Sequence, residues 1–220
     1  MTSLWSDDRA EVLADAEHDD FTNSKCQIRV ILAAKEDLFP ISKTLPDKIC
    51  IRVKGGNVSS SCTSGLPTPL HNATLRSECS SLPYLELLHA ASLRSDAFGD
   101  ACLLGSIWLQ QRGYGAGVTN GGFGQFEWAC IIALLMQSGG AKGRPMLSSG
   151  YSSYQLFKAV LQFLSTRDLV LDPLFIQSNG LALVDNKKPV FFDGARGHNV
   201  LFKLTPWSYT MVGSAGTLAF

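Results

Sequence analysis

The sequence lacks any apolar run long enough to cross a bilayer. A membrane-spanning helix needs about 18 or more apolar residues in succession, whereas the longest run here, Trp128 to Met136, has the length of a buried core helix. The acidic N-terminus also has no apolar segment of the kind that secretory signals contain. These two absences predict a soluble, intracellular chain.

The cysteines show no metal-binding or disulfide pattern. There are six, at positions 26, 50, 62, 79, 102 and 130, with no C-x-x-C pair among them. Cys102 and Cys130 fall inside apolar helical patterns, so we expect buried free thiols in a reducing compartment. Asn57-Val-Ser59 and Asn72-Ala-Thr74 match the N-glycosylation sequon, a match that intracellular proteins carry by chance.

Motifs for catalysis are incomplete throughout. The segment 150–154 resembles a nucleophile elbow but lacks the closing glycine, and Ser152 is better interpreted as a helix N-cap. The loop 139–144 lacks the spacing of a phosphate loop, and the glycines at 113–117 lack that of a dinucleotide fold. No aspartates form a D-x-D pair, and the four histidines are isolated. We therefore predict no catalytic residue, no metal site and no cofactor.

The net charge of zero hides two unlike parts. Residues 1–20 contain seven acidic residues and one base, Arg9. The remaining 200 residues hold 18 bases and 12 acids, a formal charge of +6. A mildly basic body keeps an anionic partner such as RNA within consideration.

Composition divides the chain into four parts. Residues 1–25 are acidic and poorly defined, and 26–54 contain two strand candidates, at 27–32 and 49–53. Residues 55–70 have the Gly/Ser-rich composition of a linker. The part from 71 to 220 is expected to be mainly helical.

Helix signals dominate the last part. Pro83 suits the first turn of a helix that continues through His89 or beyond. Further helices are expected at 96–111, stopped by Gly113, at 124–137, ended by Gly139-Gly140, and at 152–165. The first two of these three are apolar nearly all round and should pack together.

Short apolar runs follow, separated by turn residues. Those at 169–176, 181–184, 190–192 and 200–204 are interpreted as strands or extended segments. Thr205 and Pro206 then open a last helix, which Gly213 and Gly216 should weaken. The predicted fold class is mainly α with a short β portion, an α+β arrangement.

A set of basic residues in or beside glycine-containing loops forms the candidate RNA-binding site. Loops of this kind can contact phosphates, and nearby aromatic rings can stack on bases. An ordinary solvated surface is the alternative for each residue taken singly. The candidates are Arg112, Tyr114, Lys142, Arg144, Lys158 and Arg196. Two further aromatic residues, Phe123 and Tyr151, lie between them in the sequence.

Several long stretches resemble the Nrap family, the nucleolar RNA-associated proteins. They are Ala101 to Tyr114, Gly121 to Trp128, Gly150 to Lys158, Phe192-Asp193-Gly194 with Asn199-Val200, and Thr205 to Tyr209. Asp37 to Pro40 and Thr68 to Ala73 are also similar to that family. The resemblance covers about residue 26 to the end.

The resemblance implies an architecture. Residues 71–220 would be a helical domain like those of poly(A) polymerase and oligoadenylate synthetase, and 26–54 the closing strands of a nucleotidyltransferase-like domain. The remaining domains of a longer parent protein would then be partners. The Asp193…Asn199 spacing is similar to a D-P…N turn of poly(A) polymerases, but Gly194 replaces the proline.

The resemblance also implies a role in ribosome biogenesis, as an RNA-associated module of the small-subunit processome in the nucleolus. Pre-rRNA and processome proteins would be its partners, without a membrane. Three hypotheses remain: a non-catalytic scaffold that contacts pre-rRNA, the substrate-binding half of an active terminal nucleotidyltransferase, or a purely protein-interacting structural domain.

Overall fold

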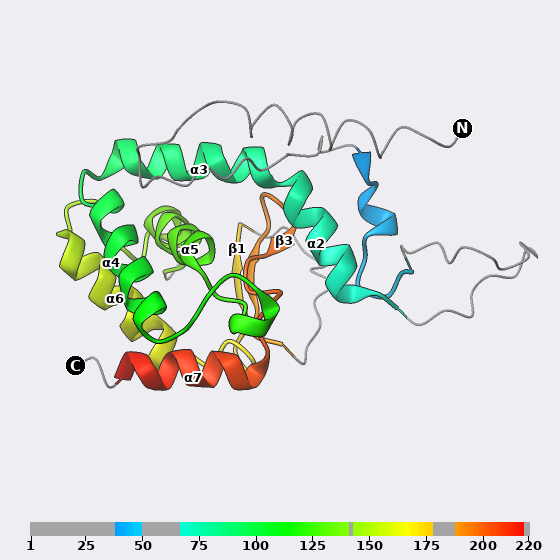
Figure 1. Cartoon of the computed structure of the whole chain (residues 1–220). Helices are drawn as coiled ribbons and strands as arrows, with labels where there is room; N and C mark the ends of the chain where they lie inside the picture. Colours follow the sequence, from blue (N-terminus) through cyan, green and yellow to red (C-terminus); the bar gives the residue numbers. More distant parts are fainter. Residues whose placement is uncertain (1–37, 50–66, 141–142, 178–187, 218–220) are drawn as a thin grey trace, which may run out of the picture. The chain divides into compact units, whose positions relative to one another are not determined.

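The computed structural model describes residues 38–49, 67–140, 143–177 and 188–217. All of them belong to the unit formed by residues 33–220. The strands predicted at 27–32 and 181–184 lie outside the described residues, as does the one at 49–53 apart from Ile49. Within the described part, helices predominate and the β portion is small, so the predicted α+β class is confirmed (Figure 1).

The centre of the fold is helix α5 (Gln125–Gln137). Ten of its thirteen residues are buried, which is why its sequence is apolar on every face. It packs against α3 (Ser81–Arg94) and α4 (Phe98–Gln111). The expected pairing of the two apolar helices is confirmed.

Helices α4 and α5 approach closely at a glycine. Trp128 of α5 is fully buried, and its indole N–H donates to the Ala101 carbonyl of α4 at 3.3 Å. A Cβ on Gly105 would lie 2.1 Å from Nε1 of Trp128, so the indole occupies the space that any side chain at 105 would need. Glycine at this position permits the helix contact.

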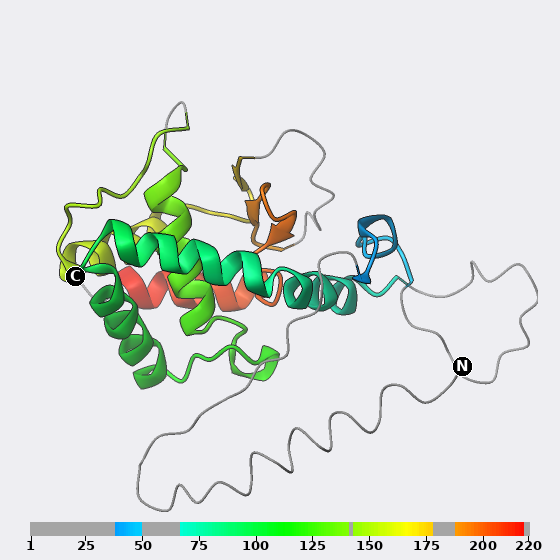
Figure 2. The ribbon, with the colours of Figure 1, turned by 90° about the horizontal axis from the view of Figure 1, so that it is seen from above.

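Helices α6 (Ser153–Thr166) and α7 (Pro206–Thr217) complete the helical part. α6 packs on both α4 and α7. α3 and α7 run along opposite sides of α5 (Figures 1 and 2). The last helix is not interrupted at its glycines: at Gly213 and Gly216 a Cβ would lie 3.1 and 3.3 Å from α6 carbonyl oxygens, so these glycines allow close packing.

The predicted helix caps are confirmed. The Ser152 hydroxyl accepts from the Gln155 N–H at 3.3 Å, and the Gln155 side chain accepts from the Ser152 N–H at 2.8 Å, a reciprocal capping box. The Thr205 hydroxyl accepts from the Ser208 N–H at 3.1 Å at the start of α7. Gly113 ends α4 with a φ of 76°, a conformation that favours glycine.

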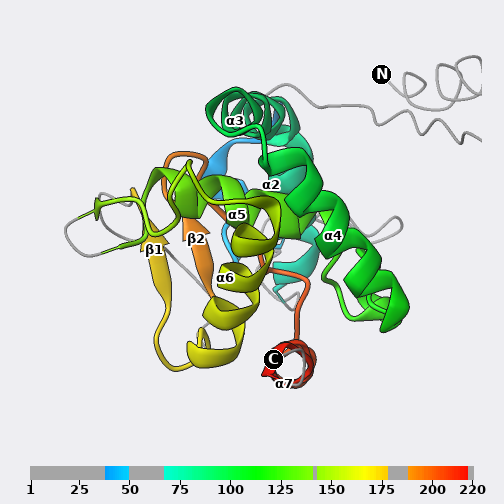
Figure 3. The ribbon, with the colours of Figure 1, turned by 90° about the vertical axis from the view of Figure 1, so that its left-hand side faces the viewer.

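Three short strands form one sheet. β1 (Leu174–Ile176) pairs in parallel with β2 (Phe191–Asp193), which pairs antiparallel with β3 (His198–Asn199). Figure 3 shows the sheet on one side of α5 and α6, with α4 on the other. The Phe191 ring meets Phe163 of α6 edge-to-face at 5.9 Å, which joins the sheet to the helical core.

Two predicted extended segments are wrong in part. In 169–176 only the last three residues form a strand, because the Asp168 carboxylate accepts from the N–H groups of Val170 and Leu171 and holds a turn. The segment 200–204 is a series of turns, because the Asn199 side chain accepts from the Leu201 N–H at 3.1 Å. A polar side chain bonding to the nearby backbone outweighs the apolar pattern in both cases.

Helix α2 (Pro69–Cys79) is not expected from its polar sequence. Asn72 anchors it from within: the residue is fully buried, and its Nδ2 donates to the carbonyls of Leu45 (2.7 Å) and Lys48 (2.8 Å). These bonds hold the loop that contains the 3-10 helix η2 (Ile41–Lys43) against α2. A buried amide engaged in this way is not open to glycosylation, so the sequon match at Asn72 is a chance one.

Two of the cysteines agree with a further expectation. Cys102 and Cys130 are buried and free, and burial raises the pKa of the Cys102 thiol to about 12. No helix among the described residues combines the length and the apolar character needed to cross a bilayer.

We expect Gly105→Ala to destabilise the fold, because the added methyl group would overlap the Trp128 indole. Overpacking of this kind costs about 1–3 kcal/mol, against a gain of up to about 1 kcal/mol in helix propensity. Gly99→Ala, in the same helix with nothing within 4 Å of its Cβ position, is the matched control and should not lower stability. Urea unfolding of both variants tests this; equal stabilities would contradict it.

Candidate nucleic-acid interface

The described candidate residues occupy three separate places. Arg112 and Tyr114 lie at the end of α4 near Lys158 on α6, Arg144 lies in the loop after α5, and Arg196 lies in the turn between β2 and β3. Lys142 is outside the described residues. The structure therefore does not bring the predicted set into one surface, and each place has its own chemistry.

At the end of α4, a cation and two rings come together; we call Trp108, Arg112 and Tyr114 the Trp108 cluster. The Arg112 guanidinium lies over the Trp108 ring, 4.5 Å from its centroid. The Tyr114 ring stacks on the same indole, with centroids 6.4 Å apart and planes 19° apart. Arg112 is exposed and forms no ion pair with a described carboxylate, whereas Trp108 is buried and Tyr114 is half-buried. The cluster therefore presents a cation beside the partly exposed ring of Tyr114.

The glycine-rich loop after the cluster has a fixed shape. Gly121 and Gly122 have φ of 91° and 72°, and the N–H of Gly115 donates to the Asn120 carbonyl at 2.8 Å around the 3-10 helix η3 (Val118–Asn120). A Cβ on Gly122 would lie 2.7 Å from the Lys203 carbonyl oxygen, so the loop lies directly on that backbone. The glycine-rich loop therefore packs against the backbone at Lys203 and is in part a structural element.

An ion pair secures the same region. Glu127 is almost fully buried; one oxygen accepts from the Gly124 N–H at 2.9 Å, and the other contacts Lys203 Nζ at 3.1 Å. The lysine charge is thus neutralised within the fold. Phe123, one of the rings considered for stacking, is fully buried beside Trp128, with centroids 6.4 Å apart, so that interpretation is wrong.

Helix α6 extends the Trp108 cluster. Phe157 meets the Trp108 ring at 6.5 Å, and the Tyr154 ring lies 6.4 Å from Phe157 with 60% of its surface exposed. Lys158 is exposed and follows Phe157 directly. The ends of two helices thus place exposed basic and aromatic groups on neighbouring elements. Burial raises the pKa of the Tyr114 hydroxyl, with Arg112 partly opposing, so this phenol stays protonated and able to donate.

Arg144 lies elsewhere, in the loop that returns from α5. Its carbonyl accepts from the Gly140 N–H at 2.9 Å, while the residue itself is exposed. Next to this loop is a pocket of about 610 Å³ that includes Arg94 and Tyr151. Arg94 donates to the Met136 carbonyl at 3.2 Å, which ties the end of α3 to the end of α5.

Arg196 is engaged inside the fold. Its Nη1 contacts Asp193 Oδ2 at 2.8 Å, its Nε donates to the Pro83 carbonyl at 3.1 Å, and its guanidinium lies 5.2 Å from the Tyr84 ring centroid. These contacts attach the β2–β3 turn to α3. Burial raises the pKa of the Tyr84 hydroxyl, and the Asp193 carboxylate, itself 1% exposed, adds to the increase.

Asn199, the other residue of the D…N spacing, is also structural. Its Oδ1 accepts from the N–H groups of Phe191 (3.0 Å) and Leu201 (3.1 Å), and its Nδ2 donates to the Pro189 carbonyl at 3.1 Å. Both polar residues of the turn are therefore occupied with holding the sheet.

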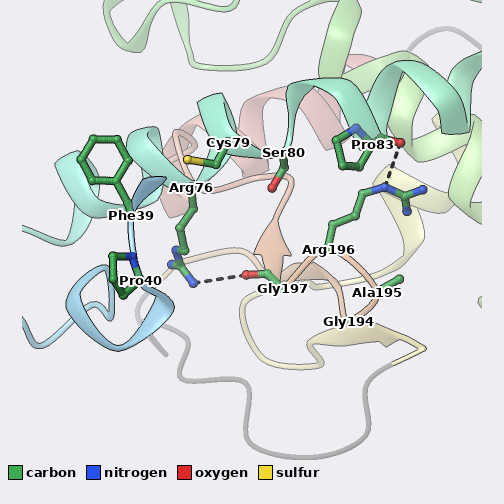
Figure 4. A pocket seen from close by; sticks show the side chains of 10 residues that line it. All are labelled: Phe39, Pro40, Arg76, Cys79, Ser80, Pro83, Gly194, Ala195, Arg196 and Gly197. Atoms are coloured by element: carbon green, nitrogen blue, oxygen red, sulfur yellow. Dashed lines mark hydrogen bonds between the residues drawn. The ribbon is translucent and has the colours of Figure 1, made fainter. Parts of the chain in front are cut away.

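One basic residue that the sequence did not single out is Arg76, on α2. It reaches across to the β2–β3 turn, where its Nη1 donates to the Gly197 carbonyl at 3.2 Å (Figure 4). No local motif marks it, because the contact joins positions 121 residues apart.

Comparison with known protein families places this fold in a class. Residues 97–219 match the Nrap protein PAP/OAS-like domain, and residues 7–94 match Nrap protein domain 1. The part from α4 to α7, with the small sheet, is thus a PAP/OAS-like module. The chain belongs to the Nrap family, as its sequence resemblance implies.

Curated relatives are much longer proteins. The chain is 33% identical over 208 residues to U3 small nucleolar RNA-associated protein 22 of Saccharomyces cerevisiae, covering 87% of this chain and 16% of the yeast protein. It is 34% identical over 176 residues to the Schizosaccharomyces pombe protein of the same name, covering 79% and 16%. Nucleolar protein 6 of Homo sapiens is 26% identical over 172 residues, covering 76% and 14%.

His198 behind the Arg196 turn gives a prediction for pH dependence. The residue is buried, and desolvation, with further contributions from Arg76 and Lys203, lowers its pKa from 6.5 to about 3. The unfolded chain therefore binds a proton below about pH 6.5 that the folded chain does not. Its contribution to the free energy of unfolding is fully present above pH 6.5 and is lost as the pH falls toward 3, by at most about 1.4 kcal/mol per pH unit.

His198→Phe should flatten this dependence, since a phenyl ring can keep the contacts with Phe202 (5.0 Å) and Tyr84 (6.2 Å) without titrating. Urea unfolding between pH 7 and pH 5 measures the slope. The exposed His89 provides the control, and His89→Phe should leave the slope as in the wild type. A slope that persists in His198→Phe would show that another group controls it.

Proposed function

We propose that this chain is a non-catalytic RNA-associated scaffold module in ribosome biogenesis, acting on pre-rRNA within the small-subunit processome of the nucleolus. Family membership supports it, together with relatives whose names specify association with U3 small nucleolar RNA and a nucleolar protein. Because the chain spans 14–16% of those relatives, further domains of a longer protein are among its proposed partners.

The observation that carries RNA contact is the Trp108 cluster. The exposed Arg112 guanidinium, which is unpaired with any described carboxylate, offers charge for a phosphate, and the half-buried Tyr114 ring offers planar surface for a base. On the adjoining helix, Tyr154 adds an exposed ring and Lys158 an exposed basic side chain. A basic–aromatic surface of this type suits single-stranded RNA without base-specific readout.

The non-catalytic part of the proposal draws on the buried carboxylates. Asp193 is engaged by Arg196 and Glu127 by Lys203, so these two acids act as structural partners of bases. Among the described residues, no group of three or more His, Cys, Asp or Glu side chains could hold a metal ion.

A protein-binding role is the second candidate, and one observation favours it. Helix α4 exposes three apolar side chains on adjacent positions: Leu103 at 56%, Leu104 at 37% and Ile107 at 45%. Apolar surface gathered on one helix is typical of contact with another protein. This face is compatible with a scaffold that binds RNA at the end of the same helix.

We expect Arg112→Gln to weaken binding of a single-stranded oligouridylate and to lower the salt dependence of log Kd by about 0.7 for each phosphate that the variant no longer neutralises. Arg167→Gln is the control with the same charge change, because Arg167 is already paired with Asp172 at 2.9 Å. Fluorescence anisotropy at several salt concentrations measures both variants. Equal weakening in the two would mean that only net charge matters, and absence of binding by the wild-type chain would contradict RNA contact.

A further inference from the structure

A pocket of about 660 Å³ lies where three segments meet: the loop before η2, the junction of α2 and α3, and the β2–β3 turn (Figure 4). The η2 loop is held in place by the Asn72 bonds to Leu45 and Lys48. The turn is held by the Arg196 bond to the Pro83 carbonyl. The walls are therefore fixed by contacts that leave the pocket itself open.

Arg76 carries a charge that no described group in the pocket balances. No described carboxylate lies within 4 Å of it, and its bond to the Gly197 carbonyl uses one of its five N–H donors. The Nε atom is buried and has no hydrogen-bond partner among the described residues. Burial lowers the pKa of this guanidinium, which reflects the cost of placing its charge there.

The groups around Arg76 do not supply the missing anion. Asp193, on the adjoining turn, is already paired with Arg196, whose side chain also lines the pocket. His198 lies behind the turn and is buried, with a pKa of about 3, so it is neutral near pH 7. Two arginines and one aspartate leave these described groups with a formal charge of +1.

We propose that this pocket binds a backbone phosphate of single-stranded RNA, with Arg76 as the phosphate ligand and Phe39 as the ring that stacks on an adjacent base. The proposal rests on the RNA association given under Proposed function and adds a second contact point, formed by elements other than the Trp108 cluster. A guanidinium with unused donors matches the geometry of a phosphate group.

The pocket favours RNA over an acidic peptide because of its aromatic wall. Phe39 is half-buried beside Pro40, and Figure 4 shows Arg76 next to them with Arg196 further along the pocket. An acidic peptide would need only the cations, whereas a ring beside a phosphate-binding arginine is the usual arrangement for an unstacked base.

The test is binding of a single-stranded oligouridylate to the full chain carrying Arg76→Gln. Removing the hydrogen bonds to a charged group should weaken binding by about tenfold or more, and the salt dependence of log Kd should fall by about 0.7. Lys43→Gln, an exposed charge change on η2 outside the pocket lining, is the matched control and should leave affinity within about twofold.

Two further variants separate binding from folding. Arg76→Lys keeps the charge and loses the planar fork, so it should bind with intermediate affinity. Phe39→Leu keeps an apolar wall and removes stacking, which should weaken binding by about fivefold or more. Thermal melting of each variant shows whether the fold is intact. If Arg76→Gln has a lowered Tm, the binding results of Arg76→Lys and Phe39→Leu decide the proposal.

The outcomes distinguish the two proposals. If the wild-type chain binds and Arg112→Gln weakens it while Arg76→Gln, Arg76→Lys and Phe39→Leu match Lys43→Gln, the pocket proposal is overturned and RNA association stands. If the oligouridylate does not bind at all, both are overturned. If a peptide of residues 1–20 binds in an Arg76-dependent manner and the oligouridylate does not compete, the pocket takes an acidic segment instead, and the proposal of a phosphate site is overturned.

Discussion

The contact between Trp128 and Gly105 fixes the arrangement on which the remaining elements depend. Because the indole fills the position of a missing Cβ, α4 and α5 lie close enough for Ala101 to accept its N–H. The Trp108 and Phe157 rings then meet the same indole at 6.3 and 5.6 Å. These contacts bring α4, α5 and α6 together around one indole.

Charge within the described part is used mainly to hold elements together. Glu127 with Lys203 joins segments far apart in sequence, Asp193 with Arg196 fixes the β2–β3 turn, and both acids are almost fully buried. Because the cost of desolvation offsets much of the attraction within a buried pair, these pairs add little net stability, although removal of one partner would leave a buried charge uncompensated. The guanidiniums of Arg76 and Arg112 are not paired with a described carboxylate, and the two proposals centre on them.

Local signals predicted the helices well, because caps act within one turn. Ser152, Thr205 and Gly113 mark boundaries that the structure confirms. Turns defined by side chains were predicted as strands or extended segments, since an apolar pattern does not reveal the bonds of Asp168 and Asn199 to nearby N–H groups. Of the candidate site, Arg112 and Tyr114 are brought together on the Trp108 ring. The position of Arg76 in a pocket could not be predicted from the sequence, because its contact is with a turn far along the chain.

Helix α3 has a consequence for how the two matched regions can be separated. It lies at the end of the region similar to Nrap protein domain 1, yet its Tyr84, Leu87 and Ala91 are buried in the same core as α5. A division of the gene at the family boundary near residue 95 would remove one wall of that core and leave α5 partly uncovered. The family boundary is therefore not a folding boundary. The PAP/OAS-like module needs α3, from the region before it, to cover its core, so the two regions must stay in one chain.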